Sequence, residues 1–292
     1  MSKRPSFLLL STPPKKARTD YDDFKMELEN IEAGKFECNS FDFASKSIGH
    51  GQFGEVFMVK HKETNDIFAV KEISYSDDRR KQILCELKFM LEHKHENLIP
   101  MNGYYIADRK LGIVMSLMKG SFEKFGEIKE EVLPKVANSV LNGLNFIHEK
   151  ELIHNDIKRE NIFLSNSNVV MLGDFGNLES FTSEKIILGT YHDPNTANYT
   201  GKEKIKRDMW AFGCTMIELV NGKRPLFAKD VIPHVEIPEN LGTKDLKDFV
   251  SLCYNADHEN GIQLLQKSTF LTQNSDQKMF YAWAEAITPK SW

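Results

Sequence analysis

The sequence has few cysteines, and no two of them are close enough in sequence to form a recognisable pair. Cys38, Cys85, Cys214 and Cys253 are far apart, and no C-x-x-C pair occurs. This spacing argues against a disulfide framework and against a zinc site, and it indicates reduced thiols inside a cell.

Long apolar runs are also missing. No stretch approaches the roughly 18 apolar residues that a membrane-spanning helix needs. The short run at residues 7–10 does not reach the roughly 7–15 residues of a signal-peptide core. We therefore expect a soluble protein with no membrane partner. Its expected location is the cytoplasm, with the nucleus as an alternative because residues 13–18 (PPKKAR) fit a nuclear-import patch.

The chain as a whole has no large net charge of either sign. The net charge is −4, and because residues 1–20 carry +4, the remaining chain carries −8. A mildly acidic body argues against nucleic acid as the main ligand. The hydrophobic share of 41%, the charged share of 27% and the mean hydropathy of −0.41 are ordinary for a globular protein. A chain of 292 residues can form one large or two-lobed domain.

The pattern of the chain changes near residue 41. Residues 1–35 are rich in charge, Pro and Ser and predict a disordered basic arm. Alternating apolar residues then predict short antiparallel strands at 41–43, 55–59 and 67–70, and another strand pair ending at 111–115. Helical spacing predicts a helix over 80–91 and, beyond Gly120, mainly helices, among them 132–147 and 209–220. Strands followed by helices indicate a sheet-rich lobe and then a helical one.

A glycine-rich motif lies in the first strands. Residues 48–56 (IGHGQFGEV) match G-x-G-x-x-G-x-V. Taken alone, the motif is compatible with a dinucleotide-binding loop, a plain hairpin, or a loop that closes over phosphates. A dinucleotide-binding loop is followed at once by a helix, whereas strand-like residues follow here.

A lysine and a glutamate form the next pair of candidates. Lys71 follows the apolar run 67–70, where an inward ammonium needs an anionic partner. Glu86, on the amphipathic helix, is the candidate partner. An exposed lysine and an exposed glutamate are the plain alternatives.

The most specific segment is 152–164 (LIHNDIKRENIFL), which contains H-x-D-x-K-x-x-N. Thirteen residues after Asn161 comes D-F-G at residues 174–176. In this pattern Asp156 accepts a hydroxyl proton and orients the nucleophile, and Lys158 neutralises charge on a moving phosphoryl group. Asn161 and Asp174 are oxygen ligands suited to magnesium.

These motifs, in this order, resemble the eukaryotic protein kinase superfamily over residues 41–271. The D-x-W-x-x-G helix at 208–213 and the H-x-N at 95–97 also fit. The resemblance implies an α+β, two-lobed fold: a small antiparallel N-lobe with one helix, about 41–118, and a larger helical C-lobe, about 119–271. Residues 272–292 are interpreted as a C-terminal extension.

The resemblance also implies ATP and Mg²⁺ as cofactors and assigns site residues. Asp156 and Lys158 are the catalytic candidates, and Asn161 and Asp174 the metal ligands. The implied ATP-binding residues are Ile48, Gly49, Gly51, Gly54, Val56, Ala69, Lys71, Glu86, Met115, Leu117, Met118 and Phe163.

Within the superfamily, residues 113–125 and 213–219 are similar to MAP kinase kinases. Met115 is then the gatekeeper and 116–118 the adenine-binding hinge. Lys158 is typical of serine/threonine and dual-specificity kinases. Lys3-Arg4 followed by Leu8-x-Leu10 resembles a docking site for a MAP kinase. A chance match, or nuclear import through 13–18, is the alternative interpretation of this arm.

Three positions depart from the superfamily pattern. Asn155 replaces the arginine of H-R-D, which often grips a phosphate on the activation loop. Asp193-Pro194-Asn195 stands in place of A-P-E, and the late arginine that pairs with that glutamate is also missing. We expect basal activity without phosphorylation of Ser180, Thr182 or Ser183. Glu184 is the candidate for a permanent negative charge, or else it is a plain exposed glutamate.

The predicted function is transfer of the ATP γ-phosphate to Ser or Thr hydroxyls of proteins, with Tyr left open. A pseudokinase that binds ATP or partners without turnover is the main alternative. A kinase for small molecules is a third. The physiological substrate, the activator and the oligomeric state do not follow from the sequence.

Overall fold

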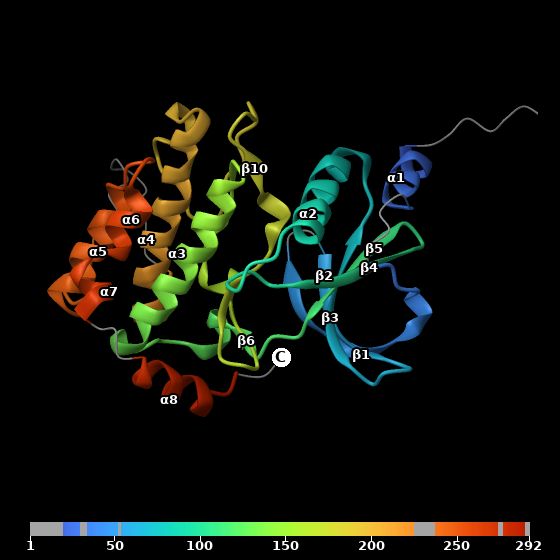
Figure 1. Cartoon of the computed structure of the whole chain (residues 1–292), viewed down its shortest axis with the longest axis horizontal. Helices are drawn as coiled ribbons and strands as arrows, with labels where there is room; N and C mark the ends of the chain where they lie inside the picture. The colour runs from blue at the N-terminus through green and yellow to red at the C-terminus, as the bar shows by residue number, and fades with distance from the viewer. Residues whose placement is uncertain (1–19, 30–33, 52–53, 225–236, 274–276, 290–292) are drawn as a thin grey trace, which may run out of the picture. The chain divides into compact units, whose positions relative to one another are not determined.

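The computed structural model describes residues 20–29, 34–51, 54–224, 237–273 and 277–289 (Figure 1). The chain divides into two units between residues 32 and 33. In the first unit, Asp20–Glu29 form helix α1, which differs from the disordered arm predicted for 1–35. Phe24 and Leu28 lie four residues apart and so share one face of this helix. The spacing of this apolar pair is typical of a helix, although the segment is rich in charged residues.

The second unit begins with a five-stranded antiparallel sheet in the order β1-β2-β3-β5-β4. Its inner cluster takes one buried residue from each strand: Phe41, Val59, Val70, Tyr105 and Val114. The strands are β1 (Phe41–Gly51), β2 (Gly54–His61), β3 (Ile67–Ser74), β4 (Met101–Ala107) and β5 (Lys110–Ser116).

Helix α2 (Arg80–Glu92) completes the N-lobe. Its apolar stripe of Ile83, Leu84 and Leu87 is buried, as the helical spacing predicts. Glu86 is buried on the same helix. Side chains alternate across a strand, so Lys71 points to the face opposite Val70 and away from the inner cluster.

The rest of the unit is mainly helical. Its long helices are α3 (Leu133–Glu149), α4 (Ile205–Asn221) and α5 (Lys244–Tyr254), followed by α6 (Gly261–Gln266), α7 (Thr269–Gln273) and α8 (Lys278–Ala286). Short strands β6 (Gly120–Ser121), β8 (Ile162–Leu164) and β9 (Val170–Leu172) form one small sheet, and β7 (Leu152–Ile153) pairs with β10 (Glu179–Ser180). The fold is therefore the predicted α+β fold with two lobes. Among the described residues, no helix is long and apolar enough to cross a membrane.

Helix α8, within the predicted C-terminal extension 272–292, packs on the helical lobe. Trp283 stacks on Phe122 with ring centroids 5.6 Å apart and meets Phe125 edge-on at 5.6 Å. Lys119 donates a hydrogen bond to the carbonyl oxygen of Ala284 at 2.6 Å. The segment thus covers the start of the C-lobe, close to where the chain leaves β5.

We expect this helix to contribute substantially to stability. Phe280 is 1% exposed and lies 5.9 Å from Trp283, centroid to centroid. Replacing Phe280 by alanine should lower the free energy of unfolding by about 3–5 kcal/mol, because the cavity left behind cannot fully collapse. Chemical denaturation measures the change. Met279→Ala on the exposed side of the same helix is the matched control, and equal losses in both variants would contradict the packing described here.

Candidate active site

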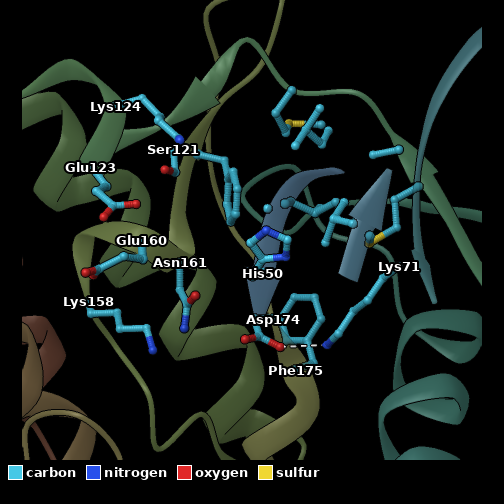
Figure 2. A pocket seen from close by; sticks show the side chains of 18 of the residues that line it. His50, Lys71, Ser121, Glu123, Lys124, Lys158, Glu160, Asn161, Asp174 and Phe175 are labelled. Carbon is cyan, nitrogen blue, oxygen red and sulfur yellow. Dashed lines mark hydrogen bonds and ion pairs between the residues drawn. The ribbon is translucent and has the colours of Figure 1, made fainter. Parts of the chain in front are cut away.

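A cavity of about 610 Å³ lies between the two lobes of the second unit. This volume is typical of a small-molecule site. Figure 2 shows polar side chains on two sides of it: Lys71 and Asp174, joined by a dashed line, on one side, and Lys158, Glu160 and Asn161 on the other. They come from β3, from the residue before the 3₁₀ turn η6 (Phe175–Asn177), and from the loop between β7 and β8.

Lys71 is held between two carboxylates. Its Nζ lies 2.6 Å from Glu86 Oε1 and 2.7 Å from Asp174 Oδ1. Burial opposes the charged ammonium, but the charges of Asp174 and Glu86 outweigh it and raise the pKa of Lys71 well above its usual value. Burial raises the pKa of Glu86. The positive charge of Lys71 opposes this increase, and the negative charge of Asp174 adds to it. Lys71 is therefore a fixed cation with an anion on either side.

A second set of contacts joins helix α2 to the turn after Asp174. The side-chain amide of Gln82 donates to the carbonyl oxygen of Gly176 and lies 3.4 Å from Asn177 Oδ1. Phe175 is buried, with ring centroids 5.1 Å from Phe89. These contacts hold Glu86 and Asp174 toward Lys71 from both sides.

The loop that follows β7 places the catalytic candidates together. Lys158 Nζ donates to Asp156 Oδ2 at 2.6 Å, and the backbone N–H of Thr190 donates to Asp156 Oδ1 at 3.0 Å. Asn161 Nδ2 donates to the carbonyl oxygen of Asp156 at 2.8 Å. Burial would raise the pKa of Asp156, but Lys158 and the Thr190 N–H more than offset it, so that this pKa lies below its usual value. Asp156 is ionised at neutral pH and available as a proton acceptor.

Asp208 of helix α4 forms hydrogen bonds to the backbone of this loop. Its two carboxylate oxygens accept the backbone N–H groups of His154 and Asn155, each at 2.8 Å, and Oδ2 also lies 2.8 Å from His148 Nε2. Burial opposes ionisation of Asp208, but the hydrogen bond and charge of His148, together with the charge and backbone N–H of His154, outweigh it and lower the pKa of Asp208. The carboxylate fixes the two residues that precede Asp156.

Loss of this carboxylate should give a pH-dependent loss of stability. A carboxyl group with a lowered pKa stabilises the fold above its unfolded pKa of about 3.9, and the contribution is lost as pH falls through the folded value. Asp208→Asn should therefore lower the free energy of unfolding by about 3 kcal/mol between about pH 5 and pH 8, and by less below about pH 4. Denaturation curves across this range measure the gap. Asp66→Asn, at an exposed position, should show no such gap, and a gap for Asp208→Asn that widens toward low pH would refute the assignment.

Apolar residues from both lobes line the rest of the cavity. Val56 and Ala69 come from the sheet, and Phe163 comes from β8. Met115, the predicted gatekeeper, lies near the end of β5, and Leu117 and Met118 of the predicted hinge follow before β6; all three line the cavity. Apolar walls of this kind suit the flat ring of a small-molecule ligand.

The structure brings together most, but not all, of the residues predicted for the site. Among the described residues, the lining does not include Gly54. Gly51 is the ladder partner of Gly54, and a Cβ on Gly54 would lie 1.9 Å from the carbonyl oxygen of Glu72. Gly54 is thus required for close packing of β2 on β3. The lining also includes residues that the motifs did not indicate: Ser47, His50, Met90, Ile99, Ser121, Glu123, Lys124, Glu160, Phe175 and Arg224.

Asn161 and Asp174 fit a magnesium ion that is shared with phosphate oxygens. They offer oxygen atoms from two loops to the same cavity, and Mg²⁺ prefers few protein ligands together with phosphates. In the described part of the chain, no group of three or more His, Cys, Asp or Glu residues could hold a metal by itself. The donor set therefore suits a metal that arrives with a nucleotide.

The positions that depart from the superfamily pattern have local partners. Asn155 adopts φ 65°, which asparagine tolerates, and its Nδ2 donates to the carbonyl oxygen of Asn177 at 3.0 Å. Asp193 is buried and accepts hydrogen bonds from the Tyr199 hydroxyl at 2.7 Å and the Asn195 N–H at 2.8 Å. Glu184, the predicted permanent charge, is exposed.

The fold and the site together define a class of protein. A five-stranded lobe and a helical lobe enclose a cavity in which a buried Lys–Glu pair faces an H-x-D-x-K-x-x-N loop and a D-F-G turn. This arrangement is that of a protein kinase.

Comparisons with known proteins agree with this class. The protein kinase domain family matches residues 44–271, so the chain belongs to the protein kinase family. Serine/threonine-protein kinase TAO3 of Xenopus laevis is 33% identical over 228 residues, which cover 70% of this chain and 25% of that protein. Human TAO3 is 32% identical over 228 residues, with the same coverage, and Xenopus laevis TAO2 is 29% identical over 230 residues, covering 71% and 22%. The chain thus spans about a quarter of the length of these relatives.

Proposed function

We propose that the chain transfers the γ-phosphate of ATP to serine or threonine hydroxyls of protein substrates. One observation carries the proposal: Lys71, Glu86 and Asp174 are already joined, and they face Asp156 and Lys158 across one cavity. The names of the similar proteins, which are serine/threonine-protein kinases, support the choice of acceptor.

Each charged group has a distinct task in this reaction. Lys71 holds phosphate oxygens of ATP, with Glu86 keeping its ammonium in place. Asp156 orients the acceptor hydroxyl and takes its proton; its lowered pKa keeps the carboxylate ionised and able to accept a hydrogen bond from that hydroxyl. Lys158, 2.6 Å from Asp156, offsets negative charge on the transferred phosphoryl group. Asn161 and Asp174 would hold Mg²⁺, which neutralises phosphate charge when it is bound.

A pseudokinase is the second candidate. Loss of catalysis usually appears in the lysine, the catalytic aspartate or the D-F-G aspartate, and here all three are present and in contact with their partners. This assembly favours turnover over binding alone.

The test combines binding with transfer. We expect Mg-ATP to raise the melting temperature of the purified chain and radiolabelled γ-phosphate to appear on a generic protein substrate. Binding without transfer would identify a pseudokinase. Transfer to a small molecule in preference to protein would identify the third candidate.

The N-terminal segment is proposed to bind a protein partner. Lys3, Arg4, Leu8 and Leu10 lie outside the described residues, and the proposal rests on their spacing alone. Two cations would meet an acidic patch while the leucines fill an apolar groove, and a tethered segment raises the local concentration of its partner.

We expect a peptide of residues 1–20 to retain MAP kinases in a pull-down. Lys3→Glu/Arg4→Glu and Leu8→Ala/Leu10→Ala should each reduce retention at least about tenfold, since each removes one half of the recognition. Lys15→Glu/Lys16→Glu is the matched control within the same peptide. Equal retention by all the peptides would exclude docking through this motif.

A further inference from the structure

A buried ion cluster lies beside the catalytic loop and plays no part in the reaction described above. Its centre is Glu179 on β10, which pairs with β7 directly before the catalytic loop. Glu179 Oε1 lies 2.7 Å from Lys204 Nζ, and Oε2 lies 3.1 Å from Arg207 NH1. All three side chains are at most 5% exposed.

The same carboxylate also reaches the catalytic loop. Asn155 Nδ2 donates to Glu179 Oε2 at 3.2 Å, and Asn155 immediately precedes Asp156. Asn155 is the position where the superfamily pattern has arginine. An arginine would bring a third cation here, whereas the neutral amide donates a hydrogen bond to a carboxylate that already has two.

A fourth contact reaches the far end of the segment 179–190. The backbone N–H of Ile187 donates to Glu179 Oε2 at 3.3 Å. Three residues later, the N–H of Thr190 donates to Asp156 and its hydroxyl lies 3.3 Å from Lys158 Nζ. Glu179 thus joins the start of this segment to Ile187. Thr190, at the end of the segment, contacts both catalytic residues, Asp156 and Lys158.

Charge explains what holds segment 179–190 closed. Two buried cations require an anion in contact with them, and the Glu179 carboxylate occupies that place. Lys204 Nζ also donates to the carbonyl oxygen of Ser180 at 3.2 Å. A phosphate on Ser180, Thr182 or Ser183 would have to displace a carboxylate that is already fully engaged. Among the described residues, Glu184 shows no comparable set of contacts.

We propose that Glu179 is a positioning residue that holds segment 179–190 and the catalytic loop ready for a protein substrate without any phosphate on the segment. The proposal rests on the kinase function proposed above. It assigns to Glu179 the role that the sequence pattern suggested for Glu184.

The variants must separate positioning from folding. Glu179→Gln alone leaves two buried cations against a neutral amide, and this variant can fail to fold. Glu179→Gln/Lys204→Met removes one cation together with the carboxylate and so restores the charge balance. Glu184→Gln, in the same segment and exposed, is the matched control.

We expect the double variant to bind Mg-ATP within about twofold of wild type, while kcat/KM for a protein substrate falls at least about tenfold. If Glu179 only stabilised the fold, the folded double variant would regain wild-type kcat/KM, and that result would overturn the proposal. Phosphatase-treated wild type and Ser180→Ala/Thr182→Ala/Ser183→Ala should keep full activity. Loss of activity in either would overturn it as well.

Hydrogen exchange separates this proposal from the proposed function. If wild type transfers no phosphate, the kinase assignment fails, but the amides of 179–190 still report the closure. Faster exchange there in the double variant than in wild type or Glu184→Gln supports positioning by Glu179. Equal exchange rates overturn it.

Discussion

Replacing Asp156 by asparagine is expected to lower kcat for protein phosphorylation by about 10²–10⁴-fold, which is the usual contribution of a positioned base. Asparagine keeps the shape and can still accept the Thr190 N–H, 3.0 Å from Oδ1 in wild type. It cannot take the hydroxyl proton and carries no charge to orient Lys158. Steady-state kinetics with a protein substrate measure the loss.

The matched control is Asp66→Asn, which makes the same chemical change at an exposed position. It should leave kcat unchanged. The Asp156 variant should also bind Mg-ATP like wild type, because Lys71 and Asp174 are untouched. If Asp156→Asn phosphorylated protein at a near-wild-type rate, another group would have to be the base.

Lys71→Met is expected to lower kcat/KM by about 10²–10³-fold, the range seen when one group that stabilises developing negative charge is removed. The substitution also leaves Glu86 and Asp174 facing each other with no cation between them, since both lie within 2.7 Å of Nζ. Repulsion should then favour protonation of Glu86, whose pKa burial already raises. We therefore expect weaker Mg-ATP binding in addition to slower transfer.

Lys60→Met, on the exposed side of β2, is the control for this change. Circular dichroism should show the same fold for both variants. A Lys71→Met protein with unchanged kcat/KM and unchanged nucleotide binding would mean that the nucleotide lies elsewhere in the molecule.

The motif residues could be predicted because each needs a particular side chain at a particular place on an ordinary element. Lys71 follows an apolar strand run and Glu86 lies on an amphipathic helix, so the need of an inward ammonium for an anionic partner indicates their contact. The spacing of Asp156, Asn161 and Asp174 is set by one short sheet, β8 and β9, which folds the loop back on itself. Local pattern and tertiary structure agree at these positions.

The Glu179 cluster and helix α8 could not be predicted, for a different reason. Glu179 and Lys204 are 25 residues apart and lie on segments whose sequences read as polar and exposed. Only the tertiary fold shows that both are buried. The apolar residues of α8, including Phe280 and Trp283, are consistent with a packed helix, but they do not show which surface the helix covers. Glu184 is the sequence-based candidate for the permanent charge because it follows Ser183 directly. The sequence does not show that Glu179, and not Glu184, is the buried carboxylate.

Phosphorylation of a peptide array by the purified chain tests the central claim most directly. The array presents Ser, Thr and Tyr acceptors in varied contexts with radiolabelled Mg-ATP, and Asp156→Asn is run in parallel. We predict label on Ser and Thr peptides with wild type and almost none with the variant. Label of equal strength with both proteins, or none with wild type that binds Mg-ATP, would contradict the assignment of a serine/threonine kinase with Asp156 as its base.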